Sequence, residues 1–298
     1  MHILMTGGTG FIGQPLVEIL LARGEQITLL SRDFGKAKKL FGSKVNLIAS
    51  IKHSGLEADV VINLAGEPII DKRWTTKRKQ KLKASRIDLT NELVEWMENC
   101  INKPAVFISG SAVGYYGNYP ENMIITEVDK PRPCFASELC QEWEHAALQA
   151  ETLGVRVCLV RTGVVLAAHG GALKRMWLPF KMGLGGKIGS GNQWFPWIHL
   201  QDMLSLLVFL IDNDSVKGAV NATATHPVTN DEFSKQFARA LNRPAFFPMP
   251  TFVVKAIFGE ASELLLEGQK VVPKKLLDNK FKFKYPQLKA ALKAIVEA

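Results

Sequence analysis

Hydrophobic residues in the first 165 positions form short apolar runs separated by stretches of helical periodicity. Continuous apolar runs are typical of strands buried on both faces of a parallel sheet, and the stretches between them are typical of covering helices. The expected strands are residues 2–5, 26–30, 45–48, 59–66, 104–108 and 155–160. This alternation predicts an α/β fold with a doubly wound parallel sheet.

Long helices are expected where apolar residues recur every three or four positions. The sequence predicts helical regions over residues 75–100, 137–151 and 200–211. After residue 165 the alternation loosens, and glycines gather in 183–191 before an aromatic segment at 194–199. We therefore expect a second, smaller lobe of mixed α/β structure in the C-terminal part of the chain.

The turn after the first strand carries glycines in the spacing Gly7-x-x-Gly10-x-x-Gly13. The first permits a tight turn, the second lets the backbone approach a phosphate, and the third lets the next helix pack on the strand. Free amides at the helix start and the helix dipole both favour an anion. The motif predicts a dinucleotide pyrophosphate site, and the turn also contributes Thr9, Phe11 and Ile12 to the predicted site.

The second strand ends in Ser31-Arg32-Asp33, and this ending predicts the type of cofactor. An acidic residue at the strand tip would hydrogen-bond the ribose 2′-hydroxyl of NAD and repel a 2′-phosphate. Ser31 and Arg32 instead offer a hydroxyl and a guanidinium, which bind phosphate through charge-assisted hydrogen bonds. Asp33 is better placed to cap the helix that begins at Phe34. The predicted cofactor is therefore NADP rather than NAD.

Three further segments contribute to the predicted cofactor site. Leu64, Ala65 and Gly66 follow the fourth strand, and such small side chains let the backbone pass close to the adenine end of a dinucleotide. Arg86 is predicted to lie beside the cofactor phosphates, with a surface that faces solvent or another subunit as an equal alternative. Cys140 is placed near the nicotinamide, although a buried structural thiol is the favoured interpretation.

A hydroxyl-rich segment, residues 109–117, follows the fifth strand, and open α/β sheets bind ligands at the carboxyl ends of their strands. Ser111 is the main candidate for a catalytic group that handles a proton. Tyr115 or Tyr116 could supply a phenol instead, although one of them is expected to pack. His199 could act as an acid or base, but a structural histidine is favoured.

The formal net charge of +9 is concentrated in residues 72–83 and 270–284. Neither segment is interleaved with aromatic residues, so solvated helix faces and a positive field for an anionic cofactor are expected rather than nucleic-acid binding. The four cysteines lack metal-ligand spacing, which predicts no metal site. With no apolar run long enough for a bilayer and a strand at the N-terminus, we expect a cytoplasmic protein without a membrane partner.

The segments 6–13, 63–66 and 111–117 together resemble the extended short-chain dehydrogenase/reductase superfamily, in its NAD-dependent epimerase/dehydratase branch. The chain is more closely similar to the epimerase family proteins of the YfcH-like group. This similarity covers essentially the whole chain and rests on residues 65–69, 85–86, 161–166, 183–186, 197–199, 265–269 and 273–275. It implies a Rossmann domain with an NADP site and a C-terminal substrate domain.

The predicted domain division follows from these observations. Residues 1–165 form an NADP-binding Rossmann domain, to which 199–225 returns, and 166–298 form a substrate-binding domain that caps it. By analogy with the fold, the two long helices after the fourth and fifth strands could form a homodimer.

The chain departs from its superfamily at the catalytic dyad. Superfamily reductases use a tyrosine as acid/base and a lysine four residues later that lowers its pKa and holds the ribose. The matching positions here are Phe135 with Leu139, or Ala136 with Cys140 if the register shifts by one. We therefore expect an atypical NADP(H)-dependent oxidoreductase acting on a small carbonyl or hydroxyl compound. The alternatives are a non-catalytic NADP(H)-binding sensor or scaffold and a nucleotide-sugar epimerase.

Overall fold

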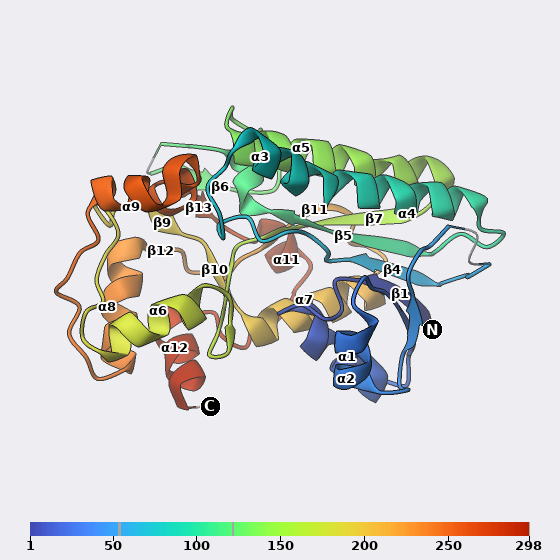
Figure 1. The fold of residues 1–298 in the computed structure, drawn as a ribbon, viewed down its shortest axis with the longest axis horizontal. Helices are drawn as coiled ribbons and strands as arrows, with labels where there is room; N and C mark the ends of the chain where they lie inside the picture. Colours follow the sequence, from blue (N-terminus) through green and yellow to red (C-terminus); the bar gives the residue numbers. More distant parts are fainter. Residues whose placement is uncertain (53–54, 121, 298) are drawn as a thin grey trace.

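A seven-stranded parallel sheet forms the centre of the computed structural model, which describes residues 1–52, 55–120 and 122–297 (Figure 1). Its strands are β1 (His2–Thr6), β2 (Gln26–Leu30), β3 (Asn46–Ile48), β4 (Val60–Asn63), β5 (Val106–Ala112), β7 (Arg156–Thr162) and β11 (Gly218–Ala222). They lie in the order β11-β7-β5-β4-β1-β2-β3, and each pairing is parallel. The predicted doubly wound, Rossmann-type α/β fold is confirmed.

Helices cover both faces of this sheet (Figure 1). One face carries α1 (Gly13–Ala22), α2 (Phe34–Phe41) and α7 (Leu200–Asp212), and the other carries α3 (Thr76–Ala84), α4 (Ile87–Asn99) and α5 (Phe135–Leu148). Because successive strand residues point to opposite faces, Ile3 and Met5 enter the core with α1 and α7, while Leu4 enters the core with α4. This two-sided burial explains the continuous apolar runs of the sequence.

The helical region expected over residues 75–100 is confirmed, and it consists of two helices, α3 and α4, that meet at Ser85 and Arg86. The Ser85 hydroxyl donates to the carbonyl oxygen of Leu82 at 3.0 Å and accepts the N–H of Glu67 at 3.1 Å. A serine side chain that bonds backbone groups in this way competes with helical hydrogen bonds.

The strand predicted at 104–108 extends further than expected, since β5 continues to Ala112 and is followed by the 3-10 helix η1 (Val113–Tyr116). Ser111 is therefore the second-to-last residue of a buried strand rather than part of a loop. It pairs with Arg161 of β7 in the sheet register. Its position on the sheet face is consequently set by the strand, and this brings its side chain toward α5.

The remaining elements form small sheets and helices beyond the central sheet. They are β6 (Ile124–Ile125), η2 (Gln149–Leu153), β8 (Val164–Ala167), α6 (Gly171–Lys181), β9 (Trp194–Phe195), β10 (Trp197–His199), β12 (Val228–Thr229), α8 (Asn230–Ala240), α9 (Thr251–Phe258), η3 (Gly259–Ser262), α10 (Glu263–Leu266), β13 (Lys270–Val271), α11 (Lys274–Asp278) and α12 (Leu288–Glu297). A third apolar core joins α6, α8 and α12. The division of the chain into two domains at residue 165 stays a prediction.

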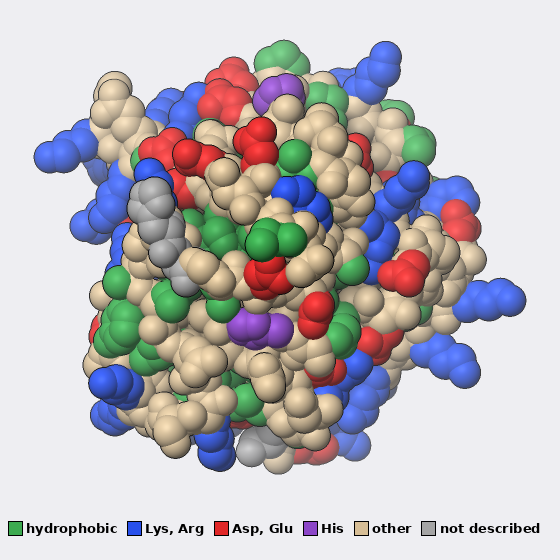
Figure 2. Space-filling view, turned by 90° about the vertical axis from the view of Figure 1, so that its right-hand side faces the viewer, with side chains coloured by type: hydrophobic (Ala, Val, Ile, Leu, Met, Phe, Trp, Pro, Cys, Tyr) green, Lys and Arg blue, Asp and Glu red, His purple; other side chains and the backbone are tan. Residues whose placement is uncertain are grey.

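Basic side chains are dispersed around the rim of the face shown in Figure 2, and acidic side chains lie among them. Of the helices in the described ranges, none combines the length and the apolar character needed to cross a membrane. The expectations about macromolecular partners, a homodimer and cellular location stay predictions.

Candidate functional site

A cleft of about 510 Å³ opens at the carboxyl ends of β1, β2 and β4. After β3 the chain returns to the other side of β1, so the strand order reverses between β1 and β4. Open α/β sheets bind their ligands at such a reversal, because the loops that leave the two strands diverge there. The cleft is therefore the place where this fold is expected to hold a nucleotide.

The glycine turn forms the floor of the cleft. Gly7 has a φ of +71°, and a Cβ atom on it would lie 2.7 Å from the backbone of Leu64. At Gly13 a Cβ atom would lie 2.2 Å from the Gly7 carbonyl oxygen. The turn after β1 and the turn after β4 thus pack backbone against backbone. This leaves a cradle without side chains that fits a diphosphate at the start of α1.

The tip of β2 forms one wall of the cleft. Asp33 accepts the N–H of Lys36 at 2.8 Å and caps α2, in the role expected for it. The side chain of Arg32 is 90 % exposed, and its Nη2 lies 3.9 Å from a carboxylate oxygen of Glu67 across the cleft. Lys36 lines the same wall, beside Ser31. Two cations and a hydroxyl therefore line the part of the cleft where a 2′-phosphate was predicted.

The structure brings eight of the thirteen predicted cofactor residues together as lining of this cleft. They are Gly7, Thr9, Gly10, Ser31, Arg32, Leu64, Ala65 and Gly66. Phe11 is not among the lining residues: a Cβ atom on Gly170 would lie only 2.1 Å from its ring, so the ring contacts the segment before α6. Ile12 packs against the core, and Gly13 is buried below the turn. Arg86 and Cys140 lie outside these lining residues.

A buried ion pair connects α5 to β7 at the end of β5. The Nε and Nη2 atoms of Arg161 each donate to Glu144 at 2.9 Å, and the Ser111 hydroxyl donates to the same carboxylate at 2.6 Å. Burial alone would lower the pKa of Arg161, but the hydrogen bonds and charge of Glu144 raise it above its usual value. The hydroxyl proton of Ser111 is therefore used in the hydrogen bond to Glu144. The hydroxyl oxygen of Ser111 can still accept a hydrogen bond from another group.

The two tyrosines of η1 have different surroundings. Tyr116 is fully buried, and its hydroxyl donates to Asn221 at 2.6 Å and accepts from Arg161 at 3.0 Å. Burial raises the pKa of Tyr116 to about 12. Tyr115 is half-buried, with the Arg161 guanidinium carbon 3.4 Å from its ring centroid. The tyrosine that packs is thus Tyr116, and Tyr115 is the one that keeps partial exposure.

The first turns of α5 carry no tyrosine and no lysine at the dyad positions. Ala136 and Cys140 face η1, and a Cβ atom on Gly114 would lie 3.3 Å from the Ala136 Cβ and 4.0 Å from the Cys140 sulfur. Burial, followed by the charge of Glu144, raises the pKa of Cys140 to about 12 although Arg86 lowers it. The thiol is therefore protonated at neutral pH, and the backbone of η1 occupies the space in front of Ala136.

His199 caps a helix. Its Nδ1 accepts the N–H of Gln201 at 3.0 Å at the start of α7, and its ring lies against Tyr285 with centroids 4.0 Å apart. Burial, followed by the positive charge of Lys284, lowers the pKa of His199 to about 4. The histidine is therefore neutral at pH 7 and holds the helix end, as the structural alternative anticipated.

This lowered pKa predicts a pH dependence of stability. The unfolded chain protonates His199 near pH 6.5 and the folded chain only near pH 4, so unfolding takes up a proton between these values. We expect the free energy of unfolding to be intact above pH 6.5 and to fall by about 1–2 kcal/mol by pH 5 through this residue. Urea unfolding of the protein and of His199→Asn, which keeps a capping group, measures it. An unchanged pH slope in the variant would contradict this role.

Several residues of the site were not identified from the sequence. Glu144 stands one helical turn after Cys140 on the same face of α5, so helical spacing is the signal that could have indicated it. Glu67 lies within the segment 65–69 that carries the family resemblance and Lys36 lies four positions after Arg32, but the sequence analysis assigned neither residue to the site. Asn221 contributes from β11, more than a hundred residues away from Tyr116, and no local pattern points to it.

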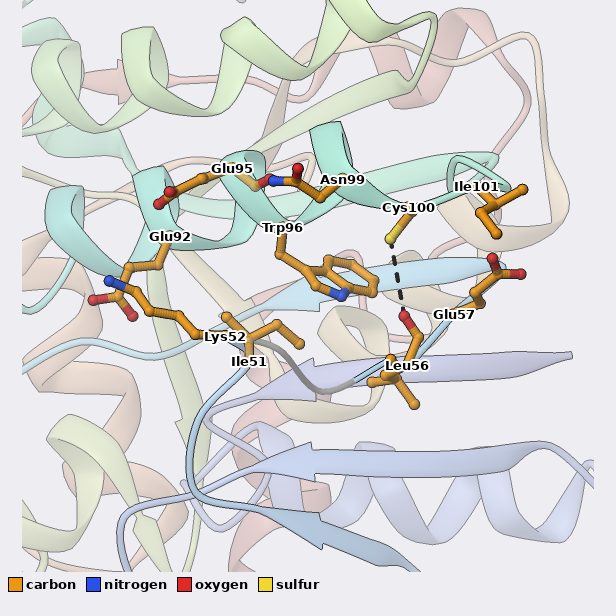
Figure 3. Close-up of a pocket in the computed structure, with 11 residues that line it drawn as sticks. Ile51, Lys52, Leu56, Glu57, Glu92, Glu95, Trp96, Asn99, Cys100 and Ile101 are labelled. Carbon is orange, nitrogen blue, oxygen red and sulfur yellow. Dashed lines mark hydrogen bonds between the residues drawn. The ribbon is translucent and has the colours of Figure 1, made fainter.

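A second cavity, of about 420 Å³, contains none of the predicted site residues. It lies between α4 and the segment that follows β3, and Figure 3 shows Trp96 pointing from α4 toward Ile51 and Lys52. The Cys100 thiol donates to the carbonyl oxygen of Leu56 at 3.9 Å on its far side. Across the ranges that the structure describes, no cluster of His, Cys, Asp and Glu side chains could hold a metal ion.

Comparison with known proteins identifies the family. Residues 3–222 match the model of the NAD dependent epimerase/dehydratase family, and residues 249–295 match a domain of unknown function, DUF1731. The mouse epimerase family protein SDR39U1 is 40% identical over 99% of this chain and 100% of its own length. The epimerase family protein SSP1921 of Staphylococcus saprophyticus is 41% identical over 99% of both chains.

A solved structure shows the same fold. The crystal structure of human epimerase family protein SDR39U1 with NADPH has a TM-score of 0.91 and 38% identity, over 100% of this chain and 99% of that one. The resemblance recognised in the sequence is therefore confirmed, and the chain belongs to the NAD dependent epimerase/dehydratase family, among its epimerase family proteins with an extended short-chain dehydrogenase/reductase fold.

Proposed function

We propose that this protein binds NADP(H) and is an oxidoreductase that acts on a small carbonyl or hydroxyl compound. The observation that carries the proposal is that two cations, Arg32 after β2 and Lys36 in the first turn of α2, line the cleft together with Ser31. Cationic side chains there attract a 2′-phosphate. The human relative crystallised with NADPH supports the same cofactor.

Each wall of the cleft has a role in this proposal. The turn from Gly7 to Gly10 and the start of α1 receive the diphosphate, because backbone amides and the helix dipole favour an anion there. The turn from Leu64 to Gly66 borders the adenosine, and Ser31 with Arg32 holds the 2′-phosphate. When bound, NADP(H) supplies or accepts a hydride, so the protein's own contribution at the reacting end is to position substrate and handle a proton.

Two protic groups at the end of β5 are candidates for that proton. Ser111 donates to Glu144 and so presents only an acceptor oxygen, which suits a substrate hydroxyl that must be held for oxidation. Tyr115 is half-buried beside Arg161 and carries a phenol that can donate. We assign the holding of the substrate hydroxyl to Ser111 and the proton transfer to Tyr115, and Ser111→Ala and Tyr115→Phe test these two roles.

A second candidate function is a non-catalytic NADP(H)-binding sensor. The observation in its favour is that neither pair of matching positions on α5, Phe135 with Leu139 or Ala136 with Cys140, supplies a tyrosine and a lysine, and that η1 packs against Ala136 and Cys140. Nucleotide-sugar epimerisation is supported by the family name rather than by these residues, and a preference for NADP argues mildly against it.

Fluorescence titration with NADPH and NADH, followed by a panel of carbonyl compounds in the same cuvette, separates these functions. We expect NADPH to bind about 100-fold more tightly than NADH, the effect of two charge-assisted hydrogen bonds. Oxidation of NADPH by a carbonyl compound would support the oxidoreductase, whereas tight binding without turnover would favour the sensor. Failure to bind either nucleotide would overturn the proposed function.

A further inference from the structure

Exposed hydrophobic side chains are concentrated on α6, on the segment that follows it and on the segment that leads into α9. Of the fifteen large hydrophobic side chains that are exposed among the described residues, eight lie within 178–184 and 246–257. They are Leu178, Met182, Leu184, Phe246, Phe247, Met249, Phe252 and Ile257, and we call this group the apolar tip. Phe246 and Phe252 have 80 % and 73 % of their surface exposed. Scattered residues of this kind are normal, but a concentration in two short segments is typical of an interaction surface.

Hydrogen bonds hold the two segments side by side. The N–H of Met249 donates to the carbonyl oxygen of Lys187 at 2.8 Å, and the N–H of Gly189 donates back to Met249 at 2.9 Å. The Nε atom of Arg243 donates to the carbonyl oxygen of Lys181 at 2.9 Å. In Figure 1 both segments run along the left-hand end of the molecule, opposite the end that holds β1 and α2. The apolar tip is therefore one surface at an end of the long axis, where a flat partner can reach it.

The same part of the chain carries cations and no acidic residue. Residues 171–187 and 239–259 contain neither aspartate nor glutamate. Their seven cations are Lys174, Arg175, Lys181, Lys187, Arg239, Arg243 and Lys255. Among the described residues, Arg175 alone of the seven forms an ion pair, with Asp71. The opposite end, shown in Figure 2, instead has acidic side chains among its basic ones. The surroundings of the apolar tip are thus positively charged.

The backbone holds the aromatic residues of the apolar tip in place. Pro244, Pro248 and Pro250 each fix a φ angle in the segment before α9. A Cβ atom on Gly186 would lie 2.3 Å from the carbonyl oxygen of Phe247, so the two segments pack backbone against backbone. A surface that is already ordered loses little conformational entropy when it docks.

We propose that the apolar tip docks on the surface of a lipid bilayer that contains anionic headgroups. Exposed aromatic and aliphatic side chains enter the boundary between headgroups and acyl chains, and the cations around them attract the lipid phosphates. A symmetric dimer through the tip is disfavoured, because its two-fold axis would bring the cations of one copy against the same cations of the other. The inference does not depend on the proposed function. The expectation of no membrane partner rested on the absence of a long apolar run, which a surface built from two short segments does not need.

Co-sedimentation with lipid vesicles tests the proposal. The native protein is mixed with vesicles of phosphatidylcholine alone or of equal parts phosphatidylcholine and phosphatidylglycerol. We expect about tenfold or stronger binding to the anionic vesicles, with most of the difference lost at high salt. Phe246→Ser with Phe252→Ser should weaken binding by about 100-fold, since each inserted phenylalanine contributes about tenfold. Lys181→Gln with Lys255→Gln should weaken binding to anionic vesicles by about 25-fold, because each cation near the surface contributes about fivefold.

Two variants on other surfaces are the matched controls. Lys38→Gln with Lys39→Gln removes two exposed cations from α2, and Ile101→Ser removes a hydrophobic side chain that is 91 % exposed. We expect both to bind anionic vesicles within about twofold of the native protein. A native protein that binds neither kind of vesicle, or equal losses in the controls, would overturn the proposal. A dimer that Phe246→Ser dissociates, without vesicle binding, would also overturn it and would assign the apolar tip to a second copy of the chain.

Discussion

Replacing Arg32 with glutamate is expected to weaken NADPH binding by about 100-fold or more and to change NADH binding by less than about threefold. The guanidinium extends from the tip of β2 with 90 % of its side chain exposed, so the substitution leaves the fold intact. It removes a charge-assisted hydrogen bond to a 2′-phosphate and places a negative charge beside it. NADH lacks that phosphate and loses little. Fluorescence titration of both nucleotides measures the difference.

Two further variants sharpen this prediction. Arg32→Gln removes the attraction without adding repulsion, so its loss of NADPH affinity should be smaller, about tenfold. Lys83→Ala removes one positive charge away from the tip of β2 and should leave the preference for NADPH unchanged. Equal losses of NADPH and NADH in Arg32→Glu would show that Arg32 does not recognise the 2′-phosphate, and the assignment of NADP would then fail.

Replacing Glu144 with alanine is expected to lower the free energy of unfolding by about 3–5 kcal/mol. The substitution leaves Arg161 buried without a counter-charge and removes the acceptor of the Ser111 hydroxyl. The cost is large because the stranded cation can neither reach water nor find another carboxylate within the salt-bridge distances of the described residues. Urea unfolding followed by circular dichroism gives the free energy.

Glu142→Ala on the same helix is the matched control, because Glu142 forms an exposed ion pair with Lys83. Exposed pairs contribute little, so we expect a change below about 1 kcal/mol. A Glu144→Ala protein as stable as Glu142→Ala would show that the buried pair does not stabilise the fold. The double variant Glu144→Leu with Arg161→Met should recover most of the loss, since replacing both partners of a buried pair by apolar residues is often neutral.

The elements of the fold could be predicted because their signals are local in the chain. The run from Ile3 to Met5 is apolar throughout, and the glycines that follow β1 are spaced for a turn and a helix start. Asp33 could be assigned as a cap because capping involves only the next few residues. The break within the helical region 75–100 could not be predicted in the same way, because apolar spacing continues through Ser85, while the Ser85 contact with Glu67 at the end of α3 is not local.

The sequence by itself determined the sheet, the nucleotide turn, the polar tip of β2 and the family, since hydrophobic period, turn chemistry and motif spacing depend on neighbouring residues. Only the tertiary structure decided which hydrogen-bond partners the polar side chains of the site have. Ser111 meets Glu144 from 33 positions away, and Tyr116 rather than Tyr115 is the tyrosine that reaches Asn221. Arg86 lies beside Gly66 and donates to the carbonyl oxygen of Glu67, 19 positions earlier in the chain. These outcomes depend on side-chain direction and on contacts between distant segments, which chain order does not encode locally.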